Sequence, residues 1–167
     1  MIGAEERAMR VRDIMTTKIW SCPANATVAS AAETMLDRSC GFVPVVGAQG
    51  EVLGVVTDRD LCMALVKRDR RASEIPVAEI CSGRIVTCGP DDEVHDVLQM
   101  MENAKIRRLP VVEEGRLRGI ISMTDVLRHA QPVRTEGDCL TCADAVGTLK
   151  MINSLHRPRK PWVAAAE

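Results

Sequence analysis

Residues 54–60 read Gly-Val-Val-Thr-Asp-Arg-Asp, and residues 119–125 read Gly-Ile-Ile-Ser-Met-Thr-Asp. Each stretch runs from a glycine through two apolar residues to a hydroxyl residue, with aspartate three positions later. The stretches belong to a longer repeat, because the segment that begins at Val11 recurs from Val77 at an offset of 66. The offset becomes 65 after one residue is lost in a turn. A repeat in one register with a single gap predicts two copies of one structural unit.

Each copy predicts the element order β-α-β-β-α. A short leading strand precedes a helix with apolar residues at i, i+3 and i+4, and two strands then form a hairpin around a glycine turn. Thr57 or Ser122 begins a second helix, and a proline inside the first hairpin strand indicates an edge position or a bulge. The fold class is therefore α/β (α+β), with two units packed with pseudo-twofold symmetry. The predicted strands are 18–22, 42–46 and 52–56 in the first unit and 84–88, 108–112 and 117–121 in the second.

The repeat also divides the chain. Residues 1–70 hold the first unit with an N-terminal leading segment, residues 71–130 hold the second, and residues 131–167 form a tail. Thr141 and Asp144 have the spacing of a helix cap. The tail therefore predicts a helix over about 142–155.

Composition narrows the classes of function. The 22 Lys+Arg against 23 Asp+Glu give a net charge of −1, so no basic field favours a nucleic-acid partner. No apolar run reaches the roughly 18 residues of a membrane-spanning helix, and the charged N-terminus lacks the apolar centre of a signal peptide. The seven cysteines are an odd number and indicate reduced thiols. We expect a cytoplasmic protein without a membrane partner.

The second helix of the first unit is apolar nearly all round. Residues 61–66 read Leu-Cys-Met-Ala-Leu-Val, and a helix without a polar face is usually buried on both sides. One side would cover its own sheet, and the other needs a partner surface. That surface is either the other repeat or a second copy of the chain, of which we favour the homodimer.

The hydroxyl-x-x-Asp pattern allows two interpretations. A hydroxyl at a helix start lies beside amides that favour a phosphate, and a carboxylate one turn later can accept hydrogen bonds from a ribose diol. The alternative is a helix capping box. A capping box prefers Glu or Gln at its last position, and it does not explain the preceding glycine. We therefore favour the ligand interpretation, and because the aspartate is present in both repeats, either site is a candidate.

The ordered motifs resemble a known family. VRDIM from residue 11, VPVV from residue 43 and GVVTDRDL from residue 54, repeated as VAEIC, LPVV and GIISMTDV, resemble tandem cystathionine-β-synthase (CBS) domains over residues 8–130. The resemblance implies two clefts between the repeats, in which adenosine lies between the leading strand of one repeat and the helix start of the other. It assigns Thr57, Arg59, Asp60, Ile85, Val86, Arg107 and Arg108 to the first cleft. It assigns Thr16, Ile19, Trp20, Gly41, Phe42, Ser122, Thr124 and Asp125 to the second.

The two clefts differ in their expected charge. Arg59, Arg107 and Arg108 suit the first cleft to a polyphosphate or a dinucleotide. The second has Gly41 and Phe42 at the equivalent places, so we expect it to be less rich in positive charge. The resemblance also implies that backbone groups around Gly41 and Arg107 recognise the adenine edge.

We conclude that the sequence encodes a regulatory sensor of an adenine nucleotide. The candidates are AMP, ADP, ATP, NAD and S-adenosylmethionine, with no required cofactor and with an unidentified protein target. No nucleophile–base pair or set of convergent carboxylates appears, so we predict no enzyme activity. One alternative is a structural or protein-interaction module with vestigial clefts. Another is a metal-linked regulator that uses Cys139 and Cys142, although no second Cys or His pair lies nearby and we assign no metal site.

Overall fold

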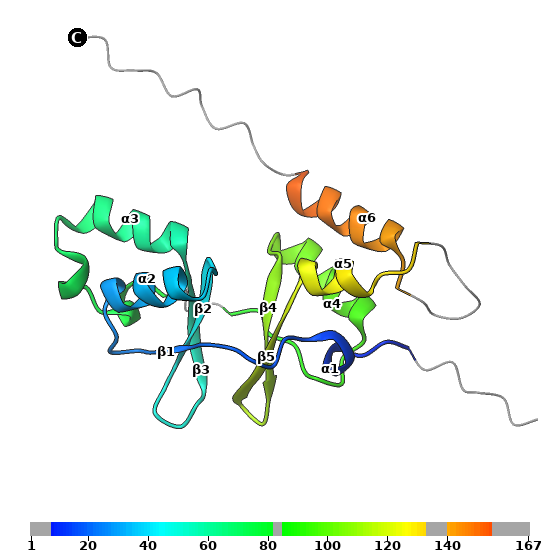
Figure 1. The fold of residues 1–167 in the computed structure, drawn as a ribbon, viewed down its shortest axis with the longest axis horizontal. Helices are drawn as coiled ribbons and strands as arrows, with labels where there is room; N and C mark the ends of the chain where they lie inside the picture. Colours follow the sequence, from blue (N-terminus) through cyan, green and yellow to red (C-terminus); the bar gives the residue numbers. More distant parts are fainter. Residues whose placement is uncertain (1–7, 82–84, 133–139, 155–167) are drawn as a thin grey trace, which may run out of the picture.

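The chain folds into two α+β repeats that lie side by side (Figure 1). The computed structural model describes residues 8–81, 85–132 and 140–154. The first repeat contains β1 (Cys22–Pro23), α2 (Val28–Asp37), β2 (Phe42–Val46), β3 (Val52–Thr57) and α3 (Asp58–Arg68). The second contains α4 (Val94–Ala104), β4 (Arg108–Glu113), β5 (Arg116–Ser122) and α5 (Met123–His129). Around them lie α1 (Val11–Ile14), η1 (Ala72–Glu74), η2 (Val77–Glu79) and α6 (Cys142–Asn153).

The two predicted hairpins are confirmed. Strands β2 and β3 pair antiparallel, as do β4 and β5. A register shift lies one residue beyond the proline of each first hairpin strand, at Val45/Val46 and at Val111/Val112. The bulge interpretation of these prolines therefore holds. The edge interpretation is wrong for β2, because β2 lies between β1 and β3 in its sheet.

The predicted leading strands are largely wrong. Only Cys22 of the range 18–22 lies in a strand, β1, which pairs parallel to β2. In the range 84–88, whose first residue lies outside the described chain, only Cys88 forms a parallel bridge, to Val111. The reason is that the segment before β1 crosses between the repeats: Thr16 is bridged to β5 of the second repeat, and Cys22 pairs with the first.

The repeats exchange their leading segments. Val11 and Ile14 of α1 lie in the hydrophobic core of the second repeat, and Ile75 and Val77 lie in the core of the first. The backbone N–H of Val11 donates to the Asp92 carbonyl at 3.0 Å. Each core is thus completed by residues that precede the other repeat in the chain, which ties the two repeats together.

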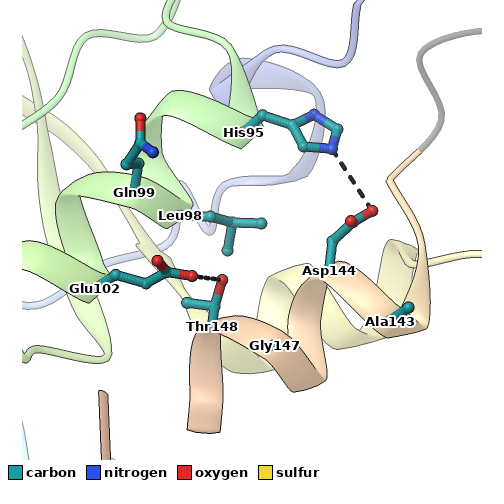
Figure 2. Close-up of a pocket in the computed structure, with 8 residues that line it drawn as sticks. All are labelled: His95, Leu98, Gln99, Glu102, Ala143, Asp144, Gly147 and Thr148. Carbon is teal, nitrogen blue, oxygen red and sulfur yellow. Dashed lines mark hydrogen bonds and ion pairs between the residues drawn. The ribbon is translucent and has the colours of Figure 1, made fainter. Parts of the chain in front are cut away.

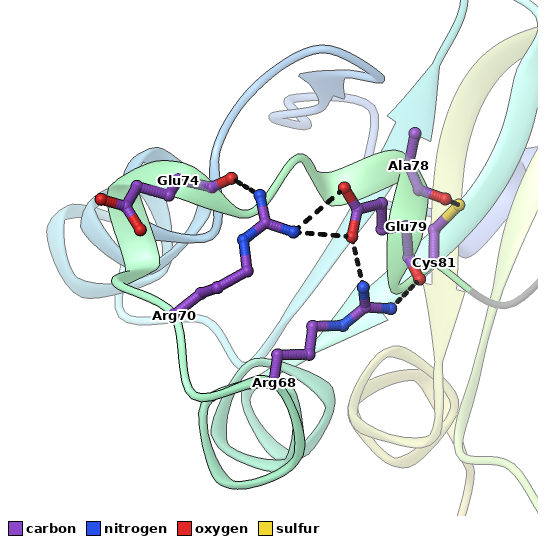
Figure 3. Close-up of polar contacts among 6 residues, drawn as sticks. All are labelled: Arg68, Arg70, Glu74, Ala78, Glu79 and Cys81. Carbon is purple, nitrogen blue, oxygen red and sulfur yellow. Dashed lines mark hydrogen bonds and ion pairs between the residues drawn. The ribbon is translucent and has the colours of Figure 1, made fainter.

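An ion-pair cluster holds the linker between the repeats (Figure 3). Arg68, at the end of α3, and Arg70 both pair with the Glu79 carboxylate, Arg70 at 3.2 Å. Arg70 also donates to the carbonyl of Glu74. These contacts fix the turn from which Ile75 enters the first core.

Helix α6 follows the second repeat and packs against α4 and α5 (Figure 1). Three residues of α6 are buried, namely Ala145, Thr148 and Ile152. The Thr148 hydroxyl donates to Glu102 of α4 at 2.7 Å (Figure 2). Among the described residues, no helix is both long and apolar enough to cross a membrane.

Candidate functional site

The three hydroxyl-x-x-Asp stretches that stand at helix starts in the described chain form capping boxes. In each one the aspartate Oδ2 accepts the backbone N–H of the hydroxyl residue at 2.9 Å and also its hydroxyl group. Aspartate therefore closes these boxes despite the usual preference for Glu or Gln, and the expectation that it argues against a cap is wrong. The third box belongs to α6, outside the repeats, so the pattern alone does not identify a ligand site. The boxes are Thr57–Asp60, Ser122–Asp125 and Thr141–Asp144.

Asp60 and Asp125 differ in the contacts of Oδ1, the carboxylate oxygen that the capping box does not use. Asp125 is buried, with 6% of its surface exposed, and its Oδ1 accepts the Thr16 hydroxyl at 3.1 Å. Asp60 is half-buried, and within the described chain no donor contacts its Oδ1. The first repeat therefore keeps one carboxylate oxygen of Asp60 without a donor in the described chain, whereas the second repeat uses the equivalent oxygen of Asp125 to hold the N-terminal segment.

The glycine that precedes the second box has a packing role. A Cβ atom at Gly119 would lie 2.9 Å from the Met15 sulfur and 3.0 Å from the Thr16 carbonyl oxygen. Thr16 and Ile120 exchange backbone hydrogen bonds of 2.9 and 3.0 Å beside it. Only a residue without a side chain allows this approach, which accounts for the glycine that the cap leaves unexplained.

A cavity of about 840 Å³ lies between the repeats where the first cleft was expected. Six of the seven residues assigned to that cleft line it, whereas Asp60 does not. Sequence reasoning missed Asp58 and Lys105, which also face the cavity. The assigned residues that the structure brings together here are Thr57, Arg59, Ile85, Val86, Arg107 and Arg108.

A second cavity of about 390 Å³ matches the other expected cleft. Gly41 does not line it and faces the first cavity instead, which corrects its assignment. Phe42 and Arg108 border both cavities, so the two clefts adjoin across these side chains. The assigned residues that line the second cavity are Thr16, Ile19, Trp20, Phe42, Ser122, Thr124 and Asp125.

The second cleft is as rich in cations as the first, contrary to expectation. Lys18, Arg38 and Arg128 line it together with the shared Arg108. The Arg38 guanidinium lies 4.5 Å from the centre of the Trp20 ring. Arg38 directly follows α2 and Arg128 lies in α5, whereas the expectation of lower charge rested on Gly41 and Phe42. Arg128 lies one helical turn after Thr124, a spacing that could have revealed it.

The backbone around Gly41 and Arg107 ties the start of each hairpin to a helix. The Gly41 carbonyl accepts the N–H of Asp58 at 3.4 Å, and the Arg107 carbonyl accepts the N–H of Met123 at 2.9 Å. A carbonyl oxygen has a second lone pair. Recognition of an adenine edge by these groups stays a prediction.

Burial makes two thiols of the chain poor nucleophiles. Desolvation raises the pKa of the Cys88 thiol to about 12, with a smaller contribution from the nearby Asp92 charge. Burial also raises the pKa of Cys22. No group of three or more His, Cys, Asp or Glu residues that could hold a metal is found in the described part of the chain. Cys139, the first residue of the Cys-x-x-Cys pair, lies outside that part.

Comparison with known proteins decides the family. The CBS domain family model matches residues 11–67 and 77–131. The CBS domain-containing protein YhcV of Bacillus subtilis is 34% identical over 131 residues, which cover 78% of this chain and 92% of YhcV. The chain belongs to the CBS domain family.

Solved CBS proteins share its fold. The CBS domain pair of protein MJ0100, in complex with 5′-methylthioadenosine and S-adenosyl-L-methionine, superimposes with a TM-score of 0.65 at 25% identity and covers 72% of this chain and 98% of its own. Hypoxic Response Protein I, with two coordinated zinc ions, superimposes with a TM-score of 0.69 at 27% identity. The match covers 74% of this chain and 100% of that protein chain. The family match ends at residue 131, so α6 is an addition to the CBS pair.

Proposed function

We propose that this CBS pair is a regulatory protein that binds an adenine nucleotide between its repeats and catalyses no reaction. The observation that carries the proposal is the cavity of about 840 Å³ at the place that the family resemblance assigns to adenosine. This volume lies within the range of about 300–1,000 Å³ typical of small-molecule sites.

The chemistry of this cavity suits a nucleotide. Ile85 and Val86 offer apolar surface for a purine ring, and Arg59, Arg107 and Arg108 bring positive charge that suits phosphate groups. Arginine binds phosphate oxygens through paired hydrogen bonds. A related CBS pair, that of MJ0100, is complexed with two adenosine-containing molecules.

The absence of catalysis is proposed from the same site. Among the described residues that line the two cavities, the carboxylates are Asp58 and Asp125. Asp125 already accepts hydrogen bonds from Ser122 and Thr16, so it is poorly placed to act as a general base. YhcV and the two solved structures above do not carry the names of enzymes.

A thermal-shift panel tests the proposal. The full chain is heated with AMP, ADP, ATP, NAD or S-adenosylmethionine at millimolar concentration. A ligand at a hundredfold excess over its dissociation constant should add about 2.7 kcal/mol to the free energy of unfolding. If none of the five raises the melting temperature, the clefts are vestigial and the chain acts as a structural or protein-interaction module.

The remaining predictions concern the surroundings of the protein. A cytoplasmic location and an interaction with a target protein stay predictions for this regulatory class. The homodimer predicted from the apolar helix also stays a prediction.

A further inference from the structure

The second cavity gathers positive charge that the described chain leaves unbalanced. Asp125 is the single carboxylate among the described residues that line it, whereas four cationic side chains do so. Within the described chain none of the four forms an ion pair. Like charges held in one cavity repel one another, and a bound anion relieves that repulsion. The cavity therefore favours a ligand with several negative charges. The four cations are Lys18, Arg38, Arg108 and Arg128.

These cations come from different parts of the fold and form two pairs. Lys18 and Arg38 both lie against Trp20, with the Lys18 Nζ 6.0 Å and the Arg38 guanidinium 4.5 Å from the centre of its ring. Arg108, in β4, and Arg128, in α5, belong to the second repeat. A guanidinium binds phosphate oxygens through paired hydrogen bonds. Because the positive charge is divided between two pairs, it suits a ligand with at least two phosphate groups.

The carboxylate of this cavity is poorly suited to a ribose diol. Asp125 is buried, and its two oxygens already accept the Ser122 amide, the Ser122 hydroxyl and the Thr16 hydroxyl. A diol would have to displace the Thr16 hydroxyl and break a hydrogen bond to a charged group. The Arg38 guanidinium also lies over the Trp20 ring, where a purine would otherwise stack. The cavity is less than half as large as the first, so these features together favour an anion without a nucleoside.

We propose that the second cavity binds an inorganic condensed phosphate, such as pyrophosphate or tripolyphosphate. The pair of cations at Trp20 binds one end of the phosphate chain, and Arg108 and Arg128 bind the other. The hydroxyls of Ser39 and Thr124 also line the cavity, and a hydroxyl can donate to a phosphate oxygen. This inference goes beyond the proposed function and does not rest on it, because the adenine nucleotide is assigned to the first cavity.

Calorimetric titration of the full chain with sodium tripolyphosphate tests the proposal. The parent should bind one tripolyphosphate per chain. Orthophosphate should bind more weakly by about tenfold or more, because a single phosphate group reaches only one pair of cations. Arg38→Ala and Arg128→Ala should each weaken tripolyphosphate binding by about tenfold to a hundredfold, the effect of losing one charge-assisted hydrogen bond. Arg116→Ala is the matched control and should bind like the parent, because Arg116 is an exposed arginine of β5 that lines neither cavity.

Two further measurements locate the anion. Arg59 lines the first cavity and not the second, so Arg59→Ala should keep the affinity of the parent for tripolyphosphate. Adenosine, which carries no charge, should not displace tripolyphosphate from the parent. Circular dichroism establishes that each variant is folded, and Arg38→Ala and Arg128→Ala are independent tests, so either one suffices if the other does not fold.

Absence of saturable tripolyphosphate binding overturns the proposal, as does equally tight binding of orthophosphate. Folded Arg38→Ala and Arg128→Ala variants that bind like the parent also overturn it. A loss in Arg59→Ala as large as that in Arg128→Ala would place the anion in the first cavity, and displacement by adenosine would make the second cavity a nucleoside site; both results contradict the proposal. Failure of every adenine nucleotide to bind, with tripolyphosphate still bound, would refute the proposed function and leave this inference standing.

Discussion

Replacing Asp125 by alanine removes three hydrogen bonds, from the Ser122 amide, the Ser122 hydroxyl and the Thr16 hydroxyl. Asp60→Ala is the natural comparison, because Asp60 makes the same capping box without the third bond. Loss of a cap costs about 1 kcal/mol. The extra bond from Thr16 to a buried carboxylate adds about 1.5–3 kcal/mol. We therefore expect losses of about 1 kcal/mol for Asp60→Ala and about 2.5–4 kcal/mol for Asp125→Ala.

Urea denaturation of the full chain measures both losses from the shift of the midpoint at unchanged slope. Thr16→Val removes the hydroxyl alone and completes a double-mutant cycle with Asp125→Ala. The cycle should give a coupling energy of about 1.5–3 kcal/mol between Thr16 and Asp125. No such coupling is available to Asp60, so Thr16→Val combined with Asp60→Ala should be additive.

Equal losses for the two alanine variants would refute this reasoning. Additivity of Thr16→Val with Asp125→Ala would refute it as well, because the N-terminal segment would then not depend on this carboxylate.

Three further predictions follow from other contacts. Gly119→Ala should lower the melting temperature, because its Cβ would lie 3.0 Å from the Thr16 carbonyl oxygen; an unchanged melting curve would contradict the close approach. Gly147→Ala should stabilise α6 by about 0.5–1 kcal/mol in urea denaturation, since no atom lies within 4 Å of the added Cβ; destabilisation would contradict an open site. The hydroxyl of Thr141 is the main cause that lowers the pKa of Asp144 from 3.8. This stabilisation is therefore present above pH 3.8 and is lost as the pH falls through the lowered value. Denaturation across pH 2–6 should show the advantage of the parent over Asp144→Asn shrinking in acid, and a constant difference would contradict this.

The internal repeat of the sequence was enough to predict most of the fold. Because one register related the segments that begin at Val11 and Val77, the hairpins and their helices could be placed without a structure. The leading strands could not, because the sequence does not show that the stretch before Cys22 crosses from one repeat to the other. The exchange of Val11 and Ile75 between the two cores is a tertiary event with no local pattern.

The sequence predicted most of the residues that line the two cavities, but it did not predict how much positive charge the second cavity holds. The residues assigned from the repeated motifs largely line the two cavities, since those motifs mark strand ends and helix starts. Arg38 was missed because the C-terminal end of α2 reaches the second cleft only when the repeats pack, and Arg128 was missed although it lies one helical turn after Thr124. The exposure of Val66 was also unexpected, because an apolar helix sequence does not say whether its second side meets the same chain.

Calorimetric titration with whichever nucleotide gives the largest thermal shift tests most directly whether it binds between the repeats. Arg108 borders both cavities, whereas Arg118, on the neighbouring strand, pairs with Glu113 at 3.1 Å and lines neither. We predict saturable binding to the full chain. Arg108→Ala should weaken it by about tenfold to a hundredfold, the value of a charge-assisted hydrogen bond, and Arg118→Ala should leave it unchanged. Absence of saturable heat, or equal weakening by the two variants, would contradict a nucleotide site between the repeats.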